Sequence, residues 1–149
     1  ELKIPAVFLG SNLDAGSDEV GRAVREWREL NKPEFVFFAK HLPPDDFYRV
    51  LARATCAIGN SSSFIREGAY FGTPAVILGS RQANRERGEN VTEIGLDVAE
   101  MKEAVLEQIG HGPYPRNLMF GDGSAGLQIA AILSRAEPKV QKTFHDYSR

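Results

Sequence analysis

The chain has 149 residues, of which 42% are hydrophobic and 26% charged, values typical of a globular protein rather than a disordered one. A formal net charge of −2 argues against a nucleic-acid-binding surface or an anionic-membrane surface. The single cysteine, Cys56, excludes an internal disulfide. Because it lies in an apolar run, we expect a buried structural thiol.

A membrane-spanning segment and a signal peptide would each leave a recognisable pattern in the sequence. No apolar stretch approaches the ~20 residues of a membrane-spanning helix, and no signal-peptide pattern opens the sequence. We therefore expect a cytoplasmic protein without a membrane partner. The chain begins at Glu1 rather than at a methionine and enters an apolar run almost at once, so we expect a domain cut from a longer polypeptide.

Short apolar runs alternate with amphipathic segments. The apolar runs predict strands at 6–9, 35–38, 56–58, 75–78 and 91–94. Helical periodicity and helix-start signals predict helices at 17–30, 45–54, 63–71, 98–109 and 127–134. This alternation is typical of right-handed βαβ units and predicts an α/β fold, a Rossmann-like parallel sheet with helices on both faces. We expect residues 1–149 to form a single domain.

Polar residues gather in the loops that follow the predicted strands, at residues 10–16, 59–63 and 79–90. Ligands of parallel α/β sheets bind beyond the carboxyl ends of the strands, where these loops lie. The loop at 59–63 reads Gly-Asn-Ser-Ser-Ser and opens onto a predicted helix. The N–H groups and the dipole of a helix N-terminus attract anions. One serine would suffice to cap the helix, so three favour phosphate binding, with simple capping as the alternative.

Two further residues suggest what the anion belongs to. Glu67 lies one turn into the same helix, where the diol of a ribose would lie beside a bound diphosphate. The alternative is an ordinary helix carboxylate that pairs with Arg66 or with the polar loop. Arg81 follows the next strand, and with Arg85 and Arg87 it forms either a phosphate-binding group or a solvated cluster of salt bridges. Together the residues predict a nucleoside-diphosphate pocket.

Other motifs carry less weight. Residues 121–126 match G-x-G-x-x-G, but no clear strand precedes them, so we expect them to start the next helix. The histidines His41, His111 and His145 show no metal-ligand spacing, and there is no Cys/His cluster. A G-x-S-x-G nucleophile motif is absent around the serines. We expect no metal, no cofactor and no Ser-His-Asp hydrolase.

The polar blocks also occur in a distinctive order. They lie at residues 12–18, at 41–43 with Phe47, at 59–63 with 65–67, at 79–82 and at 85–91. In order and spacing they resemble the UDP-N-acetylglucosamine 2-epimerase family, over most of the chain from Val7 to Val91. The likeness is greater to the hydrolysing branch, because the non-hydrolysing branch usually has Ser-Gly-Gly where this chain has three serines.

The resemblance implies a larger architecture than this chain. Members of that family have two Rossmann-like halves that face one another across a cleft, the GT-B fold, and this chain resembles only the C-terminal, UDP-holding half. It implies a missing N-terminal domain and, for the full-length protein, a homodimer. Residues 138–149 resemble the final helix, which in this fold crosses back to the other half.

The resemblance also assigns residue roles. By matching position, Ser61 and Ser62 would hold the diphosphate, Arg81 would contact the phosphates, and Glu67 would bind the ribose hydroxyls. The serines, the helix N-terminus and Arg81 would stabilise the charge that develops on UDP as it leaves. The family's acid and base groups lie in the other half, so no catalytic acid or base is expected here.

The remaining contacts come from other loops. Phe47 would lie against the uracil, and Asn12 would lie near the phosphate or the sugar. Two positions depart from the family pattern. Phe64 stands where relatives usually have glycine, which predicts a crowded helix entrance or an altered sugar side of the pocket. Gly10-Ser11 replaces a more usual aromatic-proline pair, which predicts a less rigid first loop.

The implied reaction begins with loss of UDP from the anomeric carbon and removal of the proton at C2. Water then adds to the glycal-like intermediate, so that UDP-N-acetylglucosamine and water give N-acetylmannosamine and UDP. This chain alone is expected to bind UDP weakly and to turn over nothing. The alternatives are a non-hydrolysing epimerase that interconverts the two UDP-sugars, the donor domain of a GT-B glycosyltransferase, and a non-catalytic UDP-sugar-binding module.

Overall fold

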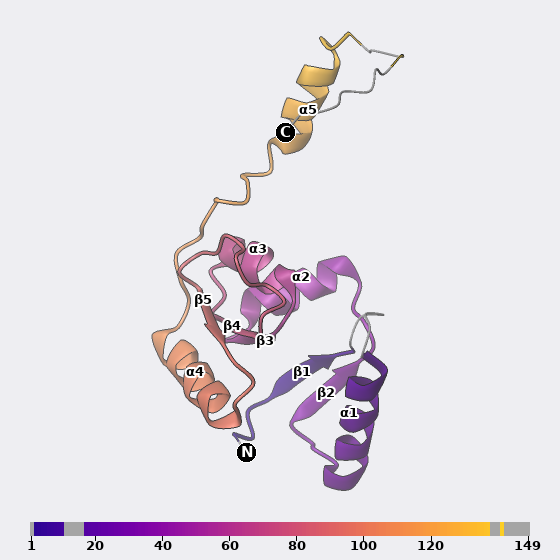
Figure 1. Ribbon diagram of the computed structural model, residues 1–149, viewed down its shortest axis with the longest axis vertical. Helices are drawn as coiled ribbons and strands as arrows, with labels where there is room; N and C mark the ends of the chain where they lie inside the picture. Colours follow the sequence, from indigo (N-terminus) through magenta and orange to yellow (C-terminus); the bar gives the residue numbers. More distant parts are fainter. Residues whose placement is uncertain (1, 11–16, 138–140, 142–149) are drawn as a thin grey trace, which may run out of the picture. The chain divides into compact units, whose positions relative to one another are not determined.

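The computed structural model describes residues 2–10, 17–137 and 141, and it divides into two compact units, residues 1–54 and 55–149 (Figure 1). The expectation of one domain over residues 1–149 stays a prediction. So does the crossover helix at 138–149, which apart from residue 141 lies outside the described residues.

The first unit contains a parallel pair of strands. Its elements are β1 (Ala6–Leu9), α1 (Ser17–Asn31), β2 (Val36–Ala39) and α2 (Pro44–Arg53). In the register of β1 and β2, Ala6 lies opposite Val36 and Leu9 opposite Ala39. A parallel pair requires a crossover connection, and α1 supplies it. Pro44 occupies the first position of α2, where its fixed φ suits the helix and no N–H is needed.

The second unit holds a three-stranded parallel sheet in the order β3-β4-β5. Its elements are β3 (Ala57–Gly59), α3 (Ser62–Phe71), β4 (Ala75–Leu78), β5 (Val91–Ile94), α4 (Val98–His111) and α5 (Ala125–Leu133). The carboxyl ends of β3 and β4 therefore lie at the same edge of the sheet, with the segments 60–61 and 79–90 leaving it.

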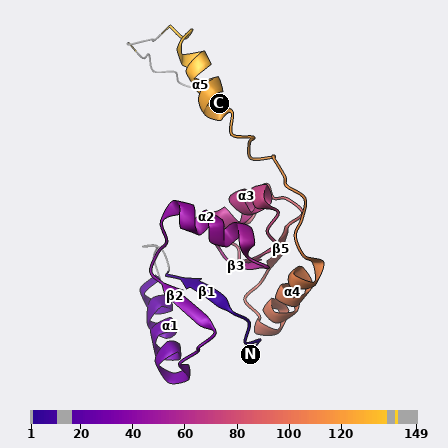
Figure 2. The same cartoon turned by 180° about the vertical axis from the view of Figure 1, so that it is seen from behind.

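The core of this unit lies on both faces of β4. Ala75, Val76 and Ile77 are fully buried, as expected for a central parallel strand made of one apolar run. Val76 packs with Ile94 of β5 and Ala104 of α4 on one face. Its neighbours Ala75 and Ile77 point to the opposite face. The helix α3 contacts β3 and β4, whereas α4 contacts β4 and β5. Helices thus cover both faces (Figures 1 and 2), which confirms the Rossmann-like α/β prediction.

The connection from β4 to β5 is a polar loop instead of a helix. It runs against α3, because a Cβ added at Gly88 would lie 3.5 Å from the Cβ of Ala69. At its end the Nδ2 of Asn90 donates to the carbonyl of Thr73 at 2.9 Å. The loop thereby buries polar residues that its composition would place at the surface.

The C-terminus of α3 is fixed by a glycine. Gly72 has φ +70°, a left-handed conformation that favours glycine. A Cβ at this position would collide with the carbonyl of Tyr114, whose own N–H donates to the carbonyl of Gly72 at 2.8 Å. The helix therefore ends at a position that tolerates only glycine.

Most predicted elements lie within two residues of their observed bounds, and the predictions for β1, β4 and β5 match to the residue. Cys56 is half-buried and packs against the α4 face of the sheet, less enclosed than expected. Burial raises the pKa of its thiol to about 11, so the thiol is protonated at neutral pH. Among the described residues, no helix has the length and apolar character needed to cross a membrane.

Candidate functional site

The N-terminus of α3 is capped by Ser61. Its backbone is extended (φ −77°, ψ 135°), and its Oγ accepts a hydrogen bond from the N–H of Ser63 at 3.3 Å. The capping alternative is therefore realised by one of the three serines. A serine hydroxyl that accepts a bond still has its own O–H to donate, so the cap leaves Ser61 able to bind an anion.

The other two serines are available in a different way. Within the described part of the chain, no hydrogen bond involves the hydroxyls of Ser62 and Ser63. The first turn of α3 contains no acidic residue, so no carboxylate of this turn offsets the positive end of the helix dipole. This helix N-terminus therefore presents amide and hydroxyl donors together with partial positive charge.

Glu67 lies on α3, one turn after Ser63, and is partly buried. The described residues form no hydrogen bond or ion pair with it, so the expected alternative, a pair with Arg66 or with the polar loop, is not seen. Arg66 instead lies with its Cζ 6.0 Å from the ring centroid of Phe120. A carboxylate thus stands near the serines without a partner among the described residues.

The loops after β3 and β4 are joined by Gln82. Its Nε2 donates to the carbonyl of Asn60 at 2.8 Å, and the side chain is buried. Arg81 is the adjacent residue and is exposed, so this bond holds the Arg81 loop against the serine loop. Sequence reasoning did not identify Gln82, because a glutamine in a polar loop carries no burial signal.

The arginine cluster divides between two roles. Arg87 forms an ion pair with Glu93 of β5, so the salt-bridge alternative holds for this residue. Arg85 is exposed and lines a shallow cavity of about 310 Å³ at the start of α3. Arg85 and Arg87 therefore do not belong to a single solvated cluster.

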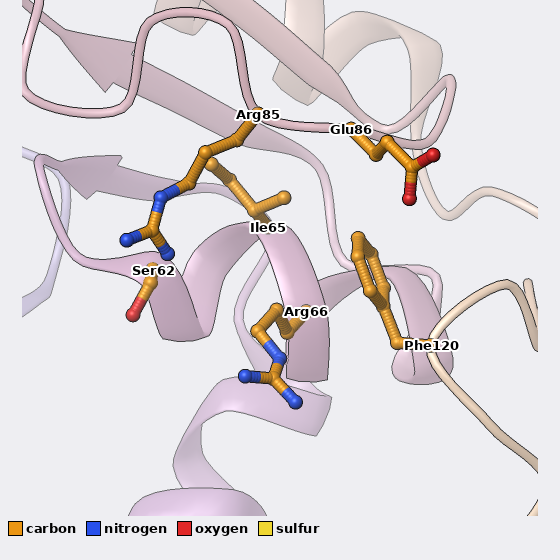
Figure 3. Close-up of a pocket in the computed structure, with 6 residues that line it drawn as sticks. All are labelled: Ser62, Ile65, Arg66, Arg85, Glu86 and Phe120. Carbon is orange, nitrogen blue, oxygen red and sulfur yellow. The ribbon is translucent and has the colours of Figure 1, made fainter. Parts of the chain in front are cut away.

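The cavity combines cationic, hydroxyl and aromatic groups (Figure 3). It is lined by Ser62, Ile65, Arg66, Arg85, Glu86 and Phe120. Ser62 is the one residue of this lining that was predicted to bind UDP directly, and Arg85 belongs to the arginine cluster for which phosphate binding was one alternative. Arg85 and Arg66 add two guanidinium groups beside Ser62, and Phe120, from the segment that leads to α5, adds an aromatic ring. Neither Arg66 nor Phe120 was predicted to contribute to a site.

The described residues of the second unit do not test the predictions for Phe47 and Asn12. Phe47 belongs to α2 in the first unit, where it is half-buried and its ring centroid lies 5.7 Å from that of Tyr48. Asn12 lies outside the described residues, as does Ser11 of the Gly10-Ser11 pair. The roles of Phe47 and Asn12 stay predictions.

The Phe64 departure has a visible consequence. A Cβ added at Gly59 would lie 3.2 Å from Cε2 of Phe64, so the Phe64 ring lies close over the loop backbone. Gly59 also has φ +149°, which disfavours other residues. The helix entrance is therefore crowded on the Gly59 side, as one of the two sequence-based alternatives predicted.

The G-x-G-x-x-G match behaves as expected. Ser124 directly precedes α5, which begins at Ala125, but its side chain makes no capping hydrogen bond. The Oδ1 of Asp122 accepts from the N–H and the hydroxyl of Ser124 at 2.9 and 2.6 Å. These bonds to Ser124 lower the pKa of the Asp122 carboxyl. The motif is a helix entry. The described residues contain no group of three or more His, Cys, Asp and Glu side chains placed to hold a metal.

The fold and the site together define a class: a Rossmann-like α/β protein with an open helix N-terminus and an arginine-bearing loop at the carboxyl edge of its parallel sheet. The model of the UDP-N-acetylglucosamine 2-epimerase family matches residues 2–134. The chain belongs to this family.

Individual relatives agree with that assignment. The chain is 31% identical to a Legionella pneumophila UDP-N,N'-diacetylbacillosamine 2-epimerase (hydrolyzing) over 85% of its own length and 33% of the relative's. It is 25% identical to a Neisseria meningitidis UDP-N-acetylglucosamine 2-epimerase over 94% of its length and 38% of the relative's. A Campylobacter jejuni GDP/UDP-N,N'-diacetylbacillosamine 2-epimerase (hydrolyzing) is 28% identical over 58% of this chain and 22% of its own. The chain thus spans between 22% and 38% of the length of these curated relatives.

Proposed function

We propose that this chain is the UDP-binding half of a UDP-N-acetylglucosamine 2-epimerase with the GT-B architecture, and that the full-length protein hydrolyses its substrate. The observation that carries the proposal is the α3 N-terminus, with serine donors, no acidic residue in its first turn, and an arginine loop tied beside it. Family membership supports the nucleotide-sugar assignment. The span of about a third of the relatives' length supports a second, N-terminal half.

The site residues divide the nucleotide among them. Ser61, Ser62 and the N-terminus of α3 hold the diphosphate, with Arg81 as the cation. Glu67 accepts hydrogen bonds from the ribose hydroxyls, a role for which its lack of a partner among the described residues suits it. Phe47 lies against the uracil. Asn12 lies near the phosphate or the sugar.

The chemistry follows from the charge that this site stabilises. When the bond from the anomeric carbon to UDP breaks, the electron pair remains on the diphosphate oxygen. Donors already aimed at that oxygen lower the barrier without reorganisation. A base takes the C2 proton to leave a glycal-like intermediate, and water adds its hydroxyl to C1 and a proton to C2. The acid and base belong to the N-terminal half, so this chain alone binds UDP weakly and turns over nothing.

The hydrolysing branch is proposed on two grounds. Two of the matched relatives are hydrolysing enzymes by name, and the triple serine at residues 61–63 differs from the Ser-Gly-Gly of the other branch. The full-length protein is proposed to be a cytoplasmic homodimer that needs no cofactor.

The decisive measurement is isothermal titration of the 149-residue chain with UDP, with uridine as the control that lacks phosphate. We expect UDP to bind and uridine to bind more weakly, because the serine loop and Arg81 contact only the diphosphate. Equal affinity for the two ligands would contradict a phosphate site. For the full-length protein, release of free N-acetylmannosamine from UDP-N-acetylglucosamine supports hydrolysis, whereas UDP-N-acetylmannosamine as product would assign the non-hydrolysing branch.

A further inference from the structure

Gln82 occupies an unusual place between the two loops that carry the proposed ligand groups. Its side chain is only 4% exposed, and its Nε2 donates to the carbonyl of Asn60 at 2.8 Å. Its Oε1 is also buried and has no hydrogen-bond partner among the described residues. A buried polar atom without a partner is costly, so packing alone does not account for a glutamine here.

The hydrogen bond from Gln82 fixes the orientation of the peptide unit between Asn60 and Ser61. The carbonyl of Asn60 and the N–H of Ser61 belong to the same peptide unit, and the described residues contain no cis peptide bond. In a trans peptide these two groups point in opposite directions. Because the carbonyl points at buried Gln82, the Ser61 N–H points away from it, and no described residue accepts from this N–H.

The same bond joins two loops that have no regular structure in common. The Ser61 loop follows β3 and the Gln82 loop follows β4, at the same edge of the sheet. Arg81 is covalently attached to Gln82, so its backbone is fixed relative to the serine loop. One side chain therefore sets both the direction of a donor and the placement of a cation.

We propose that Gln82 is a positioning residue that aims the Ser61 amide at the diphosphate and fixes the Arg81 loop beside it. This inference rests on the proposed UDP site and adds to it a residue that touches no ligand. Removing the Gln82 amide lets the peptide between Asn60 and Ser61 rotate, so the site loses affinity for phosphate while the fold persists.

Gln108 provides a matched control. It is likewise 4% exposed, its Nε2 donates to Oγ1 of Thr92 at 2.7 Å, and its Oε1 is likewise buried without a partner among the described residues. It lies on α4 and bonds to β5, so it touches neither loop. Gln82→Met and Gln108→Met each replace a buried amide by an apolar group of similar length.

The experiment compares the two variants with the unmodified chain by thermal unfolding, by titration with UDP and with inorganic pyrophosphate, and by the amide resonance of Ser61. We expect similar losses of stability in the two variants. We expect the Kd for both ligands to rise about tenfold in Gln82→Met and to stay unchanged in Gln108→Met. The Ser61 amide resonance should shift only in Gln82→Met.

Each result bears on a separate claim. Unchanged affinity in Gln82→Met, or an equal loss in Gln108→Met, would overturn the positioning role while leaving the UDP site intact. If the unmodified chain binds neither ligand, the proposed function fails. The Ser61 resonance then decides the orienting role: a shift confined to Gln82→Met supports it, and no shift overturns it.

Discussion

Two helices in the second unit begin with glycine and serine, yet their N-termini differ in chemistry. Neither helix has an acidic residue in its first turn, and the entry to α3 follows a strand. The entry to α5 follows an irregular segment, and Asp122 already accepts two hydrogen bonds from Ser124 there. A helix end that supplies its own carboxylate offers less to an external anion.

The two helices also differ in how they are held. Ile65, Gly68 and Ala69 of α3 are buried, whereas no residue of α5 is buried. Donors on α3 therefore keep fixed directions relative to the sheet, a requirement for a preorganised site. From this comparison we expect anion binding at a glycine-serine helix entry only where a strand anchors the entry and no nearby carboxylate neutralises it.

The largest expected effect comes from releasing the anchored helix. Gly72→Ala should lower the free energy of unfolding by about 3 kcal/mol, because the left-handed φ and the Tyr114 carbonyl both exclude a Cβ. Chemical denaturation measures this. Gly126→Ala on α5 is the control: nothing lies within 4 Å of its Cβ position, so stability should hold or rise slightly. Equal effects at the two glycines would contradict the difference in anchoring.

The second prediction adds a carboxylate to the α3 entry, as Asp122 does just before α5. Ser62→Asp places a carboxylate in the first turn of α3, where it should satisfy the helix dipole and repel a phosphate. We expect the affinity for UDP to fall about a hundredfold, with thermal stability unchanged or slightly higher. Calorimetric titration and thermal unfolding measure the two quantities. Undiminished UDP binding would show that the anion does not lie at this helix N-terminus.

The sequence predicted the anchored region well for physical reasons. β4 matches to the residue because one apolar run is bounded by Pro74 and Gly79, which punctuate the chain on both sides. The serine loop was found because its residues are consecutive. Its helix begins one residue earlier than predicted, at Ser62, because Ser61 itself is the cap.

The remainder depends on tertiary contacts that local patterns do not encode. Gln82 and Asn90 are buried because the β4–β5 loop runs against α3. No pattern in the neighbouring residues predicts this burial. Phe120 joins the cavity beside Ser62 from a distant segment. The sequence likewise could not predict which arginine forms an ion pair. The ion pair with Glu93 distinguishes Arg87 from Arg85.

A third, smaller effect separates the two parts of the nucleotide. Glu67→Gln should weaken UDP binding about tenfold, because an amide accepts less strongly from a diol than a carboxylate. It should leave pyrophosphate binding unchanged or slightly stronger, since no ribose is involved. Glu103→Gln, on the exposed surface of α4, should change neither. If pyrophosphate and UDP weakened together, Glu67 would act on the helix rather than on the ribose.

The smallest expected effect concerns α5 and the Asp122 carboxylate that precedes it. The bonds from Ser124 lower the pKa of Asp122 below its usual value of 3.8. A folded-state pKa below the unfolded value means that the stabilisation of α5 is complete above pH 3.8 and is lost as the pH falls through the lower folded value. Carbon chemical shifts of residues 125–133 should therefore report declining helicity on acidification, whereas Asp122→Asn should show no such pH dependence. UDP affinity at neutral pH should be the same in both proteins, because this carboxylate acts only on α5. If the helicity of α5 in the unmodified chain did not depend on pH, Asp122 would not stabilise this helix.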